Sequence, residues 1–113
     1  MKILAENLVL DTEYGENATV KLLFDRYVST NHIALTTVSQ LTGEPYLTAT
    51  CNLDADMGEF EFAVKDWSEN RGILEWLVKN EIGRSANWKI RTGHVFAEVF
   101  ELLPKYQAMI REA

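Results

Sequence analysis

The hydrophobic period of the chain changes near residue 66, and this change constrains the fold more than any other sequence feature. Before it, apolar residues alternate with polar ones over 46–53 and 59–65. A period of two is typical of strands with one buried face. After it, apolar residues over 73–78 follow the three-and-four spacing of an amphipathic helix. Strands therefore come before a helix instead of alternating with helices, which favours an antiparallel sheet.

Hydrophobic periodicity along the whole chain predicts the order of its strands and helices. The first ten residues fit either a short edge strand or one helical turn. Strand patterns then cover 18–28, 32–40, 46–53, 59–65, 88–91 and 94–102, and Pro104 suits the start of a short helix over 104–111. We predict one α+β domain over 1–113. Its antiparallel sheet has five to six strands, with one main helix packed on one face and a short C-terminal helix.

The main helix is expected over about 68–81. Asp66 or Ser68 can cap its start, and with Asp66 as the cap, Glu69 completes a variant capping box. Lys79 and Gly83 are typical of a helix C-terminus. Gly72 interrupts the pattern and weakens the helix by roughly 1 kcal/mol relative to alanine, so we expect it to permit close backbone packing.

Cysteine content and hydropathy point to the cytoplasm. Cys51 is the single cysteine among 113 residues, so it forms no internal disulfide, and its alternating context predicts a core position. The start of the chain turns acidic too early for a signal peptide. No apolar run approaches the roughly 20 residues that a membrane-spanning helix needs, so we expect no membrane contact.

The motifs of common enzyme and cofactor sites are missing from the sequence. The six glycines are scattered and form no phosphate loop. One cysteine and two histidines do not meet zinc-ligand spacing, and the segment that begins Asp54-Ala55-Asp56 lacks the later residues of a calcium loop. His32 and His94 are expected at solvated strand ends. We therefore expect no cofactor, no metal and no catalysis.

Charge is distributed unevenly along this chain of net charge −6. Residues 54–69 hold six acidic side chains against one lysine, whereas residues 70–91 hold five cations against two acids. An acidic surface repels nucleic acid and can attract a basic protein surface, although solubility alone also explains acidity.

The strand alternation over 59–65 places carboxylates on one face, with two aspartates in the preceding loop. Aromatic and arginine side chains are the usual anchors of protein interfaces. The predicted protein-contact residues are Asp54, Asp56, Glu59, Glu61, Asp66, Trp67, Glu69 and Arg71. The cationic stretch 84–91 around Trp88 is the alternative surface, and Trp76 is expected in the core.

Part of the chain also resembles a known family. The segments Gly43–Tyr46, Ala49–Leu53, Val64–Gly72 and the helix over 74–82 resemble short bacterial proteins that are classed as a domain of unknown function. The resemblance covers about residues 42–102. It implies an origin on plasmids or other mobile elements, and the family brings no catalytic residues.

Together these patterns favour a non-enzymatic acidic protein that binds a protein with a basic surface. The mobile-element resemblance favours an inhibitor of a bacterial defence complex, such as a CRISPR effector nuclease. A small-molecule-binding domain, a small enzyme and a purely structural role are the alternatives. A deep pocket with convergent polar groups would favour a ligand site, whereas an exposed acidic face would favour protein binding.

Overall fold

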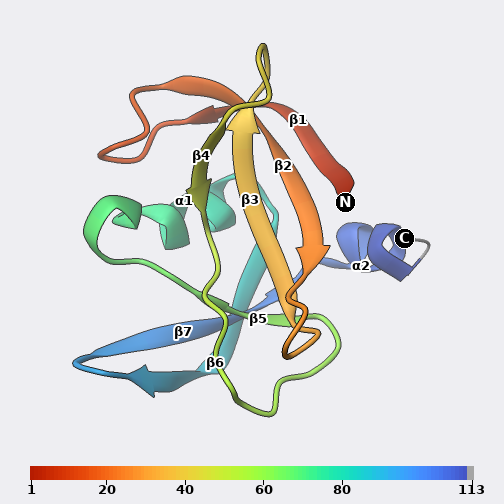
Figure 1. Cartoon of the computed structure of the whole chain (residues 1–113), viewed down its shortest axis with the longest axis vertical. Coiled ribbons are helices and arrows are strands. Elements are labelled where there is room, and N and C mark those ends of the chain that lie inside the picture. The colour runs from red at the N-terminus through yellow and green to blue at the C-terminus, as the bar shows by residue number, and fades with distance from the viewer. Residues whose placement is uncertain (112–113) are drawn as a thin grey trace.

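Two antiparallel sheets form most of the protein, which a computed structural model describes over residues 1–111 (Figure 1). The chain is α+β, as its sequence predicts. The first sheet has the strand order β1 (Lys2–Leu10), β2 (Ala18–Arg26), β3 (Ile33–Ser39) and β4 (Pro45–Thr48). The second sheet has the strand order β5 (Glu61–Val64), β7 (Val95–Leu102) and β6 (Gly83–Thr92).

The prediction of a single five-to-six-stranded sheet is therefore wrong. The strand predicted over 46–53 pairs in register with β3 as far as Thr48, and the next N–H, of Ala49, donates to the Leu35 carbonyl at 2.8 Å. Beyond it, the backbone crosses to the second sheet, where Cys51 N–H donates to the Ala63 carbonyl at 3.0 Å and Lys65 N–H donates to the Ala49 carbonyl at 2.9 Å. Alternation sets which side chains are buried but not which strands pair, so one apolar pattern serves both sheets.

The main helix also differs from its prediction. A 3₁₀ turn covers Ser68–Asn70, and α1 begins only at Ile73 and ends at Lys79. Gly72 separates the two because it adopts a left-handed conformation with φ 99°, which glycine accepts without a steric penalty. The capping box does not form. Asp66 nevertheless serves the start of α1, because its Oδ1 accepts the N–H groups of Gly72 at 2.7 Å and Ile73 at 2.9 Å.

One hydrophobic core receives side chains from both sheets and both helices. With seven residues, α1 is only about 10 Å long. It does not cover one face of a single sheet as predicted. Its buried side chains Ile73, Trp76 and Leu77 instead join the shared core. The C-terminal helix α2 (Pro104–Arg111) has its predicted range and contributes Tyr106 and Ile110.

The predicted strand ranges are largely confirmed. The first ten residues form an edge strand and no helical turn. β6 starts five residues earlier than its pattern predicts, because an irregularity between Ser85 and Lys89, with Asn87 at φ 65°, breaks the alternation. None of the helices within residues 1–111 has the length and apolar character to cross a membrane.

Candidate functional site

The connection between β4 and β5 carries three of the eight predicted contact residues, Asp54, Asp56 and Glu59, and we call residues 52–59 the acidic loop. Exposure alternates along it. Asp54 and Asp56 are exposed, whereas Leu53, Ala55 and Met57 are half-buried. Neither aspartate takes part in an ion pair or a side-chain hydrogen bond within the described residues. Both carboxylates are therefore available to solvent or to a partner.

The acidic loop is held against the β2–β3 turn, which it passes at the bottom of Figure 1. Asn52 is bonded twice to this turn. Its Oδ1 accepts the Thr30 hydroxyl at 2.7 Å, and its Nδ2 donates to Ser29 Oγ at 2.9 Å. At the other end of the loop, Gly58 N–H donates to Glu61 Oε1 at 2.6 Å. Bonds at both ends thus position the carboxylates between them.

Glu61 is occupied within the fold. Besides its bond to Gly58, its Oε2 accepts the Trp88 indole N–H at 3.1 Å. Trp88 lies on β6 and Glu61 on β5, and β7 separates these strands, so the bond spans the second sheet. Trp88 is half-buried, and its indole N–H therefore contributes to the structure of the second sheet.

Glu59 is exposed and lies near the last turn of α2. Its Oε2 is 3.8 Å from an Arg111 guanidinium nitrogen, and the same guanidinium lies 4.9 Å from the centre of the Phe60 ring. A solvent-exposed pair at this distance contributes little to stability. Glu59 therefore remains a candidate contact residue beside Asp54 and Asp56.

A cavity of about 380 Å³ opens between the acidic loop and the β2–β3 turn, and we call it the loop cavity. Carboxylates from Glu59 and Glu61 line it together with His32, whose Nδ1 is buried and lacks a hydrogen-bond partner within the described residues. His32 is half-buried, unlike the solvated strand end that the sequence predicts. His94 is exposed in the β6–β7 turn.

The remaining predicted contact residues follow β5 and lie before α1. Asp66 accepts hydrogen bonds from the start of α1, as described above. Trp67 is half-buried. Glu69 is exposed and accepts a hydrogen bond from Lys65 Nζ at 2.8 Å, which lowers the pKa of the Glu69 carboxyl. These side chains thus serve local structure more than a shared surface.

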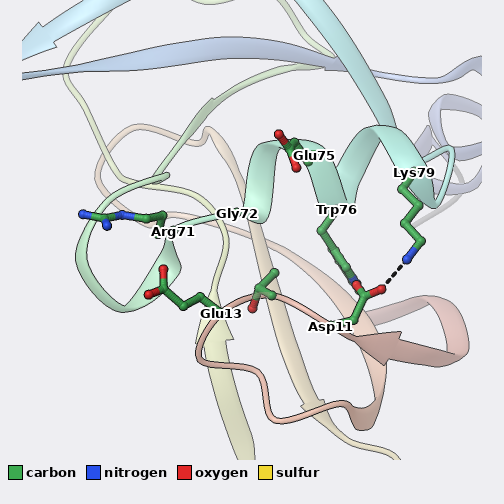
Figure 2. Close-up of a pocket in the computed structure, with 8 residues that line it drawn as sticks. Asp11, Glu13, Arg71, Gly72, Glu75, Trp76 and Lys79 are labelled. Atoms are coloured by element: carbon green, nitrogen blue, oxygen red, sulfur yellow. Dashed lines mark hydrogen bonds and ion pairs between the residues drawn. The ribbon is translucent and has the colours of Figure 1, made fainter.

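Arg71 lies at a second cavity, of about 420 Å³, between α1 and the turn after β1 (Figure 2). Asp11 accepts a hydrogen bond from Lys79 there, and this bond lowers the pKa of the Asp11 carboxyl. Figure 2 shows Arg71 and Glu75 pointing away from the Asp11–Lys79 pair. The polar groups of this cavity therefore diverge, whereas a small-molecule site needs convergent ones.

The two cavities mark opposite ends of the molecule. The loop cavity is lined by Arg26, the last residue of β2. The cavity beside Arg71 is lined by residues 11–13, which directly follow Leu10, and Leu10 pairs with Ala18, the first residue of β2. A nine-residue strand separates its ends by roughly 26 Å. The eight predicted contact residues consequently divide into two groups, with Asp54, Asp56, Glu59 and Glu61 in one.

Cys51 and the possible metal ligands complete the description of chemically reactive side chains. Burial raises the pKa of the Cys51 thiol, whose Sγ lies 3.9 Å from the Ala63 carbonyl oxygen. Within residues 1–111, no three His, Cys, Asp or Glu side chains are grouped as metal ligands require. The sequence did not predict that His32 and the acidic loop line one cavity, because His32 and Glu59 are 27 positions apart and no local pattern connects them.

The chain matches no family of proteins, no curated protein and no solved structure.

Proposed function

We propose that this chain is a non-enzymatic binding protein whose acidic loop docks on a basic protein surface. One observation carries the proposal: Asp54 and Asp56 are both exposed, whereas the residues on either side of each are half-buried. A partner with two neighbouring cations could pair with both carboxylates at once.

The attachment of the loop favours binding. The side chain of Asn52 bonds to Ser29 and Thr30 at one end of the loop, and Glu61 accepts the Gly58 N–H at the other end. A segment that is ordered before binding loses less conformational entropy when a partner arrives. The exposed carboxylates also retain their hydration until contact, so they cost the folded protein little.

The charge of the whole chain narrows the partner class. A net charge of −6 opposes direct binding of nucleic acid, which needs a cationic footprint. It speeds encounter with a basic surface and makes that encounter sensitive to salt. Basic channels that normally hold nucleic acid are the partner surfaces that fit best, and a bacterial defence nuclease is our candidate owner of such a channel. Occupying the channel would block the nuclease.

The cavity beside Arg71 gives little support to the alternative of a small-molecule site. The diverging polar groups around Arg71 in Figure 2 offer no common focus for a small ligand.

The test is a capture experiment with matched charge reversals. The double variant Asp54→Lys/Asp56→Lys removes the proposed contact. The control Glu16→Lys/Glu44→Lys reverses two other exposed carboxylates that have no side-chain bond within the described residues. Immobilised wild type and control should retain the same basic protein from a bacterial lysate at about 0.05 M salt and release it at about 0.5 M. Retention by the Asp54/Asp56 variant at wild-type level would refute the proposal.

A further inference from the structure

The loop cavity lies directly beside the exposed aspartates of the acidic loop. Its volume is about 380 Å³, within the range of pockets that hold small groups. Its lining comes from the β2–β3 turn on one side and from residues 57–61 on the other. A side chain of a protein docked on Asp54 and Asp56 could enter this cavity, because Met57, the next residue after Asp56, lines it.

The lining selects for a cation that can make several hydrogen bonds. Glu59 and Glu61 supply carboxylate oxygens, each with more than one lone pair. Glu61 already accepts one hydrogen bond on each oxygen, so it is fixed in place and still has capacity. Half-buried Met57 and buried Ile33 give the cavity an apolar wall, against which an aliphatic stem can pack.

His32 adds an unsatisfied group to the same cavity. Buried polar atoms in proteins almost always have a hydrogen-bond partner, so an orphan such as His32 Nδ1 calls for an explanation. An imidazole ring that lines a cavity can also stack on a planar guanidinium.

We propose that the loop cavity receives an arginine side chain of the protein that docks on the acidic loop. The inference rests on the proposed function and names the partner's anchor residue. A guanidinium presents five N–H donors in a planar fork, which suits two carboxylates from different positions better than the compact ammonium of lysine. Buried arginines are frequent anchors of protein interfaces.

Arg26 lines the same cavity and gives the proposal a sharp prediction. Its guanidinium donates to the Asn31 carbonyl at 3.0 Å and lies 5.4 Å from the centre of the Phe24 ring. It has no ion pair within the described residues, so it places a like charge near the incoming guanidinium. Removing it should strengthen binding of an arginine.

The experiment uses two synthetic peptides of about eight residues that differ at one position, Arg or Lys in a glycine-serine background. Binding is followed by amide chemical shifts of the ¹⁵N-labelled full chain, with Gly58, His32 and the Trp88 indole as reporters. The arginine peptide should shift all three and bind several-fold more tightly than the lysine peptide. Glu59→Gln should weaken it several-fold, and Arg26→Gln should strengthen it. Free N-acetyl-arginine amide separates a small-molecule site from a partner's anchor, because it should bind more weakly than the peptide.

Equal binding of the two peptides, or shifts that leave the three reporters unmoved, would overturn the inference. So would tighter binding of the free amide than of the peptide. Thermal melts establish that each variant is folded, and Glu44→Gln is the matched control for Glu59→Gln because Glu44 is exposed and lies in the β3–β4 turn. If Asp54→Lys/Asp56→Lys abolishes partner capture while the peptides do not discriminate, only the anchor fails and the docking proposal stands.

Discussion

Replacing Glu61 with alanine separates a structural carboxylate from the docking carboxylates beside it. The change removes the acceptor of two hydrogen bonds, at 2.6 Å from Gly58 N and 3.1 Å from Trp88 Nε1. Hydrogen bonds to a charged group contribute about 1.5–3 kcal/mol when shielded, and we take about 1–1.5 kcal/mol for each at this half-buried position. Glu101 lies directly opposite Glu61 in the strand register, so relief of like-charge repulsion offsets roughly 0.5 kcal/mol. The expected loss is about 2 kcal/mol.

Urea unfolding followed by tryptophan fluorescence measures this loss, and the melting temperature should fall by roughly 8 °C. Asp54→Ala is the matched control, because Asp54 is exposed and free of side-chain bonds within the described residues; it should stay within about 0.5 kcal/mol of wild type. A Glu61→Ala variant as stable as the Asp54→Ala control would refute the structural role of Glu61. It would also return Glu61 to the set of free contact carboxylates.

Two further predictions concern the side chains of Asp66 and Cys51. Asp66→Ala should cost about 1–2 kcal/mol in urea unfolding, because the first N–H groups of α1 lose their acceptor, and a loss below about 0.3 kcal/mol would contradict this assignment. Because burial raises the pKa of the Cys51 thiol, its alkylation by iodoacetamide should rise with pH at higher values in the folded protein than in urea. Coincident pH profiles in the two states would show that burial does not control this thiol.

Local sequence patterns predicted much of the secondary structure correctly. Alternation located the strands, and Pro104 marked the first residue of α2, because both signals depend on neighbours a few positions apart. The single-sheet prediction failed because the crossing of residues 49–51 from one sheet to the other leaves the alternation unchanged. The helix began late because Gly72 adopts a positive φ, which no periodicity reveals.

In the candidate site, too, the sequence predicted local features but not contacts between residues far apart in the chain. Sequence placed Asp54 and Asp56 in a polar connection, and the structure gives both high exposure. It could not distinguish them from Glu61, whose partner Trp88 lies 27 positions away and across a strand. Contacts of this range depend on the tertiary fold, so charge counting alone overestimates the number of free carboxylates.

A charge-swap measurement on the captured partner tests the central claim most directly. The dissociation constant is measured at low salt for wild type and for Asp54→Lys/Asp56→Lys, each against the partner and against a partner variant whose contacting lysine or arginine is changed to glutamate. If the acidic loop docks on that cation, either reversal alone should weaken binding at least tenfold, about 1.4 kcal/mol. The two reversals together should restore much of the loss. Unchanged affinity of the Asp54/Asp56 variant, with its fold intact, would contradict the account.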